Sequence, residues 1–147
     1  MAQGAVDVAR ESIECFNDDE FDRLRSLLAD DSYEEELSTQ RRLEGVDAQI
    51  EAAKGWKQAF PDGRGTVHGA YADGNTVTLE LTWEGTQSGP MQTPDGQQIP
   101  ASNRHGKVKA CQVIEVEDGE IKATRHYFDL MTLLQQIGVM EQAGAAT

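Results

Sequence analysis

The spacing of hydrophobic residues changes at Pro61, and this change constrains the fold more strongly than any other feature of the sequence. Before Pro61, hydrophobic residues recur every three or four positions, which is typical of helices that bury one face. After Pro61 they alternate with polar residues, which is typical of strands with one buried side and one side in water. The order of the two patterns predicts an α+β fold in which helices cover one face of a curved antiparallel sheet.

Three helices are predicted in the first half of the chain and one at its end. Residues 6–16, 21–28 and 46–60 carry hydrophobic side chains at helical spacing, and the following proline ends the third helix. The segment DLMTLLQQIG, residues 129–138, repeats this spacing and ends at a glycine. Four strands are predicted between the third and the last helix, at residues 66–72, 75–85, 106–117 and 120–128.

The segment ATRHYFD, residues 123–129, concentrates groups that can transfer protons. As a strand it places His126 and Phe128 on one face and Asp129 on the other. Asp129 directly precedes the last helix, so a capping role is favoured over a catalytic one. Two interpretations of His126 remain open: a buried histidine hydrogen-bonded to a neighbour, or a proton carrier that lines a pocket.

The length and the charge of the chain limit its partners. A chain of 147 residues has room for one domain, residues 1–147, with a core at about 6–138 and a short flexible tail. Its 26 acidic and 13 basic residues give a formal net charge of -13, which disfavours nucleic acid and anionic membranes as partners. The excess of acidic residues suits either a solubilising surface or a salt-rich cytoplasm.

The sequence contains none of the usual motifs for metals, phosphates or nucleophilic serines. The three histidines lie in separate segments, and glycine-rich phosphate loops and G-x-S-x-G are absent. Cys15 and Cys111 form no C-x-x-C pair, and neither a signal peptide nor 18 consecutive apolar residues occur. We therefore expect a cytoplasmic protein that uses no metal and no cofactor and works by acid/base chemistry or simple binding.

Residues 85–107 form a long polar connection rich in Gly, Pro and Gln. Connections of this length inside a compact domain usually contribute to a functional site. We expect this segment to form the rim of a pocket.

Four motifs occur in the order and spacing of a known family: AFPD at 59–62, WEGTQSGP at 83–90, VIEVEDGEI at 113–121 and HYFDLMTLLQQIG at 126–138. Together they resemble the SnoaL-like polyketide cyclases, which belong to the superfamily named for nuclear transport factor 2. The resemblance implies a cone-shaped fold in which a curved antiparallel sheet and three to four helices enclose an apolar pocket. It also implies a homodimer formed through the sheet, and ring closure by intramolecular aldol condensation without metal or cofactor.

The sequence departs from this family at three places. Counted from the hairpin EDGEI, the acid/base aspartate of the family corresponds to His126. The polar pair on the preceding strand corresponds to Ala110 and Gln112, and Gln87 replaces the histidine of the common G-T-H-T-G-P segment. Because an imidazole can also act as a general base, His126 is the predicted catalytic residue.

The predicted pocket is lined by inward-facing side chains of several elements. The expected lining residues are His126, Gln112, Tyr33, Trp83, Ile114, Phe128 and Trp56. Aromatic rings would form flat walls, and Gln112 or Tyr33 would donate a hydrogen bond to an enolate oxygen. Three functions fit such a pocket: a cyclase, isomerase or lyase acting on a small hydrophobic carbonyl compound, a non-catalytic binding module for such a molecule, and a dimeric interaction domain.

Overall fold

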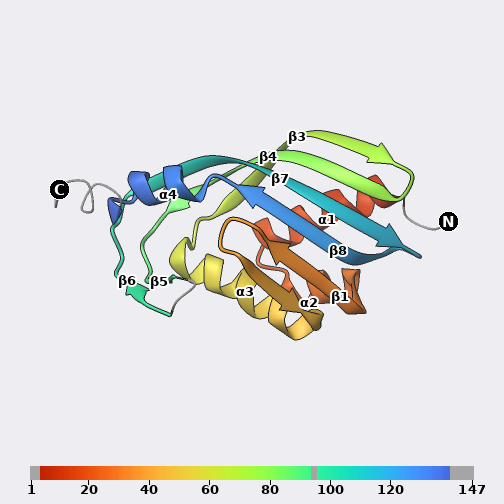
Figure 1. Cartoon of the computed structure of the whole chain (residues 1–147), viewed down its shortest axis with the longest axis horizontal. Helices are drawn as coiled ribbons and strands as arrows, with labels where there is room; N and C mark the ends of the chain where they lie inside the picture. The colour runs from red at the N-terminus through yellow and green to blue at the C-terminus, as the bar shows by residue number, and fades with distance from the viewer. Residues whose placement is uncertain (1–3, 94–95, 140–147) are drawn as a thin grey trace.

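The computed structural model describes residues 4–93 and 96–139 as four helices and two sheets (Figure 1). The helices are α1 (Ala5–Asn17), α2 (Phe21–Leu27), α3 (Gly45–Ala59) and α4 (Leu130–Gln136). The four predicted helices are confirmed with ends shifted by a few residues, because each has one hydrophobic face to pack on the sheet. The predicted flexible tail, residues 140–147, lies outside the described residues.

The larger sheet has six strands in the order β2-β1-β8-β7-β4-β3. The strands are β1 (Leu28–Glu36), β2 (Arg41–Glu44), β3 (Arg64–Asp73), β4 (Thr76–Thr86), β7 (His105–Glu117) and β8 (Glu120–Phe128). The four predicted strands correspond to β3, β4, β7 and β8, and neighbouring pairs among them run antiparallel. Alternating hydrophobic and polar residues therefore identified the part of the sheet that has an apolar inner face.

Strand β1 runs parallel to β8, so the sheet is mixed, and the prediction of a wholly antiparallel sheet was wrong at this pair. The register places Glu34 beside Thr124 and Glu36 beside His126. Neither β1 nor β2 was predicted, because the sequence of β1, LADDSYEEE, lacks alternation of hydrophobic and polar residues. The parallel pair brings acidic residues next to the end of β8.

The polar connection at residues 85–107 folds back on itself and is held by one buried side chain. Its short strands are β5 (Met91–Gln92) and β6 (Gln98–Ile99). Gln87 is fully buried, and its amide nitrogen donates to the carbonyl oxygens of Gly89 (3.0 Å) and Pro100 (3.2 Å). Its amide oxygen accepts a hydrogen bond from the backbone N–H of Ser102 (3.1 Å). The residue that replaces the family histidine therefore has a structural role.

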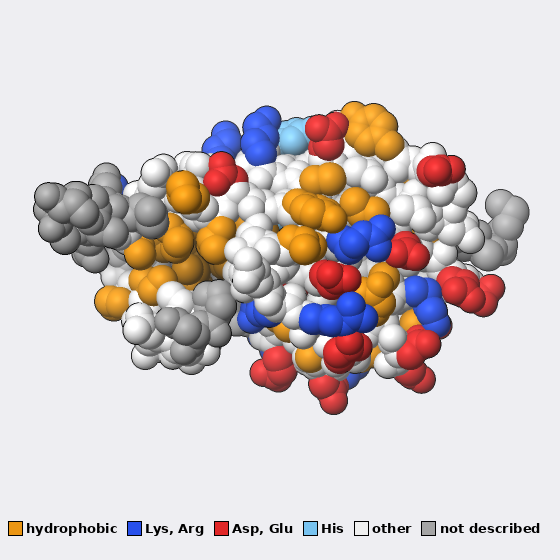
Figure 2. Space-filling view, viewed as in Figure 1, with side chains coloured by type: hydrophobic (Ala, Val, Ile, Leu, Met, Phe, Trp, Pro, Cys, Tyr) orange, Lys and Arg blue, Asp and Glu red, His pale blue; other side chains and the backbone are white. Residues whose placement is uncertain are grey.

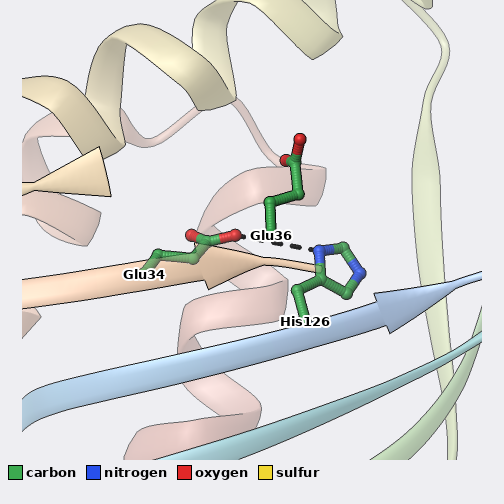
Figure 3. Close-up of side chains that lie close together, drawn as sticks. All are labelled: Glu34, Glu36 and His126. Atoms are coloured by element: carbon green, nitrogen blue, oxygen red, sulfur yellow. Dashed lines mark ion pairs between the residues drawn. The ribbon is translucent and has the colours of Figure 1, made fainter. Parts of the chain in front are cut away.

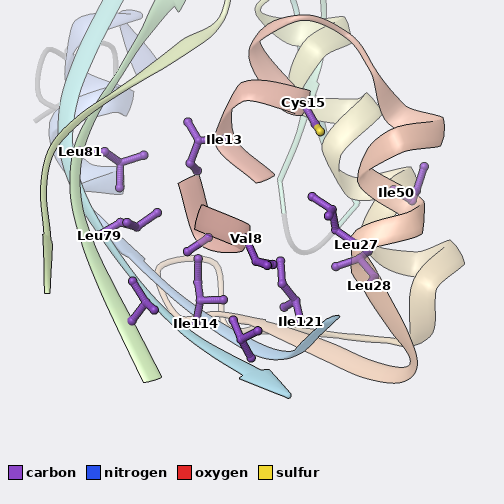
Figure 4. Close-up of a cluster of buried hydrophobic side chains, with 13 residues drawn as sticks. Val8, Ile13, Cys15, Leu27, Leu28, Ile50, Leu79, Leu81, Ile114 and Ile121 are labelled. Atoms are coloured by element: carbon purple, nitrogen blue, oxygen red, sulfur yellow. The ribbon is translucent and has the colours of Figure 1, made fainter. Parts of the chain in front are cut away.

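Buried hydrophobic side chains form two clusters. The larger lies between the helices and the curved sheet (Figure 4) and includes Val8, Leu79, Leu81, Ile114 and Ile121. The smaller lies near α4 and includes Ala59, Phe60, Val108, Leu133 and Ile137. Members of both clusters line one cavity, which therefore lies between them.

Figure 1 shows the long strands β4, β7 and β8 crossing the molecule, with α4 at the end far from the N-terminus. Helices α1 and α3 contact the sheet, α1 mainly through β3 and α3 mainly through β1. None of the described helices is long and apolar enough to span a membrane. The helices and the curved sheet thus enclose the space in which the candidate site lies.

Candidate active site

The cavity between the helices and the sheet has a volume of about 160 Å³. Its apolar lining includes Ile13, Phe16, Leu24, Leu28, Trp56, Phe60, Trp83, Val108, Ile121, Phe128 and Leu133. Its polar lining includes Ser12, Glu34, Glu36, Gln49, Gln112, Thr124 and His126. Apolar walls with a few convergent polar groups are typical of sites that bind small molecules.

Five of the seven residues predicted to line the pocket do so: His126, Gln112, Trp83, Phe128 and Trp56. On β8 the buried His126 faces the cavity together with Phe128, whereas Tyr127 between them is exposed. Strand alternation therefore places the histidine and the phenylalanine on the inner face of the sheet, as the sequence predicted.

Tyr33 and Ile114 do not line the cavity. Tyr33 belongs to β1, where Glu34 points inward, so Tyr33 points outward and its ring lies 3.8 Å from the Arg42 guanidinium. Ile114 faces the same side of β7 as Gln112, but it lies two residues further along the strand, where the hydrophobic core of α1 covers the sheet. The path of β1 therefore turns Tyr33 away from the cavity, whereas Ile114 lies on the predicted inner face but within the core.

The imidazole of His126 is buried among aromatic rings and makes one hydrogen bond within the described part of the chain. The indole Nε1–H of Trp83 donates to Nε2 of His126 at 3.0 Å, and the Phe128 ring centroid lies 5.0 Å from the imidazole centroid. An indole N–H only donates, so Nε2 must accept, and the proton of the neutral imidazole lies on Nδ1. This assignment of the tautomer follows from the geometry of the hydrogen bond.

Glu34 lies beside the protonated nitrogen of this imidazole (Figure 3). Its Oε2 is 3.7 Å from Nδ1 of His126, and its side chain is 21% exposed. Within the described part of the chain, this carboxylate makes no hydrogen bond, and His126 is its one titratable partner within 4.0 Å. Glu34 is therefore a cavity-lining carboxylate whose oxygens remain available to a bound molecule.

Glu36 is also buried near His126, but its oxygens are already bonded. Oε1 accepts from Thr39 (2.6 Å) and Arg41 (2.8 Å), and Oε2 accepts from Trp56 Nε1–H (3.0 Å). Burial raises the pKa of Glu36, but the hydrogen bonds and the charge of Arg41, with the bonds from Thr39 and Trp56, hold it below its usual value. Glu36 is therefore a fixed negative charge that also orients Trp56.

The carboxylates of Glu34 and Glu36 and the imidazole of His126 place one potential metal ligand each within 4.8 Å of one another. A cation bound there would have to displace Arg41 or Trp56 from Glu36. It would also compete with the Trp83 N–H for the Nε2 lone pair of the neutral His126 imidazole. The donor set suits proton transfer better than metal binding.

Gln112 and Thr124 add polar groups to the same region of the sheet. Gln112 lies opposite His126 in the β7–β8 register and is 8% exposed. Its amide has no hydrogen-bond partner among residues 4–93 and 96–139, and the hydroxyl of Thr124 has none there either. Because Gln112 lines the cavity and its amide atoms are not sealed off from it, this amide is free to bind a polar atom of a ligand.

Asp129 caps the last helix, as predicted. One carboxylate oxygen accepts from the Thr132 backbone N–H (3.0 Å) and the other from the Thr132 hydroxyl (2.6 Å). These hydrogen bonds hold the pKa of Asp129 below its usual value. Asp129 is not among the cavity-lining residues, so the carboxylate nearest to His126 in sequence is not the one nearest in space.

Trp56 and Ala52 separate this cavity from an outer groove, because they line both. The groove has a volume of about 640 Å³, and part of the 85–107 connection lines it, including Pro90 and Met91. Figure 2 shows hydrophobic side chains gathered at the end of the molecule where α4 and the β5–β6 hairpin lie. The expected rim segment thus borders the outer groove along several residues.

Comparisons with known proteins agree with this architecture. The sequence profile described as SnoaL-like polyketide cyclase matches residues 6–137. None of the curated proteins compared with the chain matches it.

Solved structures resemble the chain over nearly its whole length. IdmH from Streptomyces antibioticus, a candidate polyketide cyclase, has a TM-score of 0.79 at 21% identity, covering 93% of this chain and 100% of IdmH. A candidate SnoaL-like polyketide cyclase from Jannaschia sp. CCS1 has a TM-score of 0.77 at 18% identity, with 93% and 96% covered. An LEH-like epoxide hydrolase from M. tuberculosis has a TM-score of 0.70 at 19% identity, with 97% and 96% covered.

At these identities the solved structures show a shared fold, and they confirm the predicted nuclear transport factor 2-like, α+β architecture. The family profile goes further because it spans nearly the whole sequence. The chain therefore belongs to the SnoaL-like polyketide cyclase family.

Proposed function

We propose that this chain is a cofactor-independent acid/base enzyme, of the cyclase, isomerase or lyase type, that acts on a small hydrophobic carbonyl compound. The observation that carries the proposal is the pair formed by His126 and Glu34, 3.7 Å apart, beside the unpartnered amide of Gln112. The rest of the cavity is largely apolar. Titratable groups gathered in an apolar cavity are typical of acid/base active sites.

The cavity favours a flat hydrophobic molecule that carries one polar oxygen. Trp56, Trp83 and Phe128 supply aromatic walls. An apolar cavity of about 150 Å³ accommodates benzene, so the volume of about 160 Å³ admits at least one ring. The free amide of Gln112 would donate to a carbonyl oxygen of the bound molecule.

The chemistry common to the three reaction types is removal of a proton next to a carbonyl group. This step needs a base for the proton and hydrogen-bond donors for the oxygen that becomes negative. In our proposal His126 and Glu34 form the proton-transfer pair, and Gln112 holds the oxygen. Cyclisation, isomerisation and elimination share this first step. The pair of His126 and Glu34 therefore supports acid/base chemistry in general and does not select one of the three reactions.

Two measurements test the proposal, and 1-tetralone serves as the probe. Trp56 and Trp83 are the two tryptophans of the sequence and both line the cavity, so tryptophan fluorescence reports binding. Exchange of the α-hydrogens of the ketone in D2O, followed by proton NMR, reports proton removal. His126→Ala should bind the probe and lose exchange by about 100-fold or more, since general acid–base groups contribute this much.

His68→Ala is the matched control because His68 lies on β3 and is not among the cavity-lining residues. It should retain both binding and exchange. A folded His126→Ala protein that exchanges the ketone at the wild-type rate would contradict the proposal. Binding by the wild type without any exchange would instead support the alternative function, a non-catalytic binding module. Such a module would use the same aromatic walls and the same Gln112 amide to hold its ligand.

A further inference from the structure

The two members of the proton-transfer pair are held differently, and this difference separates their tasks. We propose that Glu34 takes the proton from the substrate, while His126 stays neutral and donates a hydrogen bond from Nδ1, with Trp83 holding it in that tautomer. The inference rests on the proposed function, which does not say which member of the pair accepts the proton. It assigns the base to β1, whereas the family resemblance points to β8.

Trp83 occupies the lone pair with which His126 would accept a proton. The lone pair of Nε2 already accepts the indole N–H at 3.0 Å, and Nδ1 carries the proton of the neutral ring. A proton on Nε2 would face the indole proton, so charging the ring would break this hydrogen bond. The Trp83 ring is itself held by edge-to-face contact with Phe16, at 5.2 Å between centroids. The tautomer is therefore set by packing as well as by the hydrogen bond.

Of the two carboxylates beside His126, Glu34 is the one that remains free to accept a proton. Both oxygens of Glu36 are bonded to Arg41, Thr39 and Trp56, and its side chain is 2% exposed. Glu34 accepts no hydrogen bond from any described residue, and its side chain is 21% exposed. Of the two glutamates, Glu34 alone can reach a bound molecule without losing partners.

The parallel pairing of β1 with β8 explains how a carboxylate reaches this end of the cavity. In the register of β1 and β8, Glu34 lies beside Thr124, which precedes His126 by two residues on β8. The inward face of β1 then directs the Glu34 carboxylate toward His126 Nδ1 (Figure 3). The chain thus supplies a carboxylate from the neighbouring strand.

The step balances without any additional reactant. One oxygen of Glu34 forms an O–H bond with the proton of the carbon next to the carbonyl group. The electron pair of the broken C–H bond forms the C=C bond of an enolate, and the carbonyl π pair moves to the oxygen. That oxygen accepts hydrogen bonds from His126 Nδ1–H and from the amide N–H of Gln112, which has no partner among the described residues. Glu34 then returns the proton to the product.

The distance between the pair is compatible with this division. At 3.7 Å, Glu34 Oε2 and His126 Nδ1 are beyond hydrogen-bond length, so the N–H is not committed to the carboxylate. A substrate oxygen can therefore receive it. A neutral imidazole that donates to an enolate oxygen, beside a glutamate base, is an established arrangement in enzymes.

Exchange of the α-hydrogens of 1-tetralone in D2O tests the role of Glu34. Glu34→Gln keeps the size of the side chain and should lower the exchange rate by about 100-fold or more. Glu35→Gln is the matched control because Glu35 is the next residue on β1, points to the outer face and pairs with Arg42. It should exchange the ketone like the wild type. Wild-type exchange by a folded Glu34→Gln protein would overturn the assignment of the base.

Two further readouts do not depend on turnover. In 15N spectra of labelled histidine, neutral His126 should carry its proton on Nδ1, and Trp83→Phe should allow the Nε2–H form to appear. The second probe is 4-nitrophenol at slightly acid pH, where its O–H can donate to a carboxylate. Glu34→Gln should bind it about tenfold more weakly than wild type and Glu35→Gln equally well, since a charge-assisted hydrogen bond is lost.

The outcomes distinguish this inference from the proposed function. If the wild type exchanges no hydrogens of the ketone, the proposed function fails. The binding of 4-nitrophenol and the tautomer of His126 in the 15N spectra still test the roles of Glu34 and Trp83. An Nε2–H tautomer in the wild type, or an unchanged tautomer in Trp83→Phe, would overturn the role of Trp83. Equal phenol affinity in Glu34→Gln and wild type would overturn the role of Glu34.

Discussion

Each tryptophan of the cavity donates its indole N–H to a titratable side chain. Trp83 donates to His126 and Trp56 donates to Glu36, both at 3.0 Å. A buried indole needs such a partner, and the partner also fixes the orientation of the ring. Because both N–H groups are used, the indoles serve as apolar walls and leave polar recognition to groups such as Gln112.

Glu36→Gln is predicted to destabilise the fold by about 1–3 kcal/mol, because charge-assisted hydrogen bonds become neutral ones. The bonds affected come from Arg41, Thr39 and Trp56. Urea unfolding should show a lower midpoint with an unchanged slope. Glu35→Gln, on the opposite face of β1, should unfold like the wild type. A wild-type midpoint for Glu36→Gln would show that the buried cluster does not stabilise the fold.

The difference in unfolding free energy between the wild type and Glu36→Gln should depend on pH. Burial raises the pKa of Glu36, but the hydrogen bonds from Arg41, Thr39 and Trp56 and the charge of Arg41 together lower it by more than burial raises it. The pKa of Glu36 in the folded protein therefore lies below its value in the unfolded chain. Ionised Glu36 therefore stabilises the fold above the ordinary glutamate pKa of about 4.3, and this contribution is lost as the pH falls through the folded value. The free-energy difference between wild type and Glu36→Gln should be constant from neutrality to about pH 5 and shrink below about pH 4. Urea titrations at several pH values measure it.

Strand alternation predicted the orientation of His126 and Phe128, whereas nothing in the sequence pointed to Glu34 and Glu36. The two acids belong to the triplet EEE in an acid-rich chain, a pattern that usually marks a solvated surface. Their burial depends on parallel pairing with β8 and on Arg41, which lies on the next strand. Neither feature has a local signal in the sequence.

Among the elements, those that pack on the core were predicted and those that border the cavity were missed. Strands β4, β7 and β8 have apolar inner faces, so their period of two is visible in the sequence. After Leu28, the inward residues of β1 are polar: Ser32, Glu34 and Glu36. The polar residues that contribute to the candidate site therefore also hide the strand that carries them.

Gly65→Ala is predicted to destabilise the fold by about 1–3 kcal/mol through overpacking. Gly65 pairs with Trp83 across β3 and β4, and a Cβ there would lie 2.7 Å from the indole ring. The displaced ring would lose its hydrogen bond to His126, so tryptophan emission should shift. Gly55→Ala is the matched control, because a Cβ on this residue of α3 meets no atom within 4 Å. It should not weaken the fold, since alanine favours helices more than glycine does. Unchanged emission and stability in Gly65→Ala would contradict the packing argument.

For the molecule as a whole, the outer face of the large sheet differs from the rest of the acidic surface. The net charge is -13, which opposes contact between two copies. The outward-facing charges along β4, β7 and β8 include Glu80, Lys107, Lys109, Glu115 and Arg125. Basic residues therefore offset acidic ones on this face. Two large side chains, Tyr71 and Tyr127, are 59% and 45% exposed on it.

We predict that two copies associate through this face. Light scattering at micromolar concentration should give twice the chain mass of 16.1 kDa. Tyr127→Arg should convert the dimer to a monomer, because it removes an exposed aromatic side chain from the interface. In a twofold dimer both copies carry the new positive charge, so the two charges also repel each other. Met131→Arg is the matched control: Met131 is 62% exposed on α4, away from the sheet face, and the change adds the same charge. A monomeric wild type would refute the prediction, and a monomer produced equally by Met131→Arg would locate the interface elsewhere.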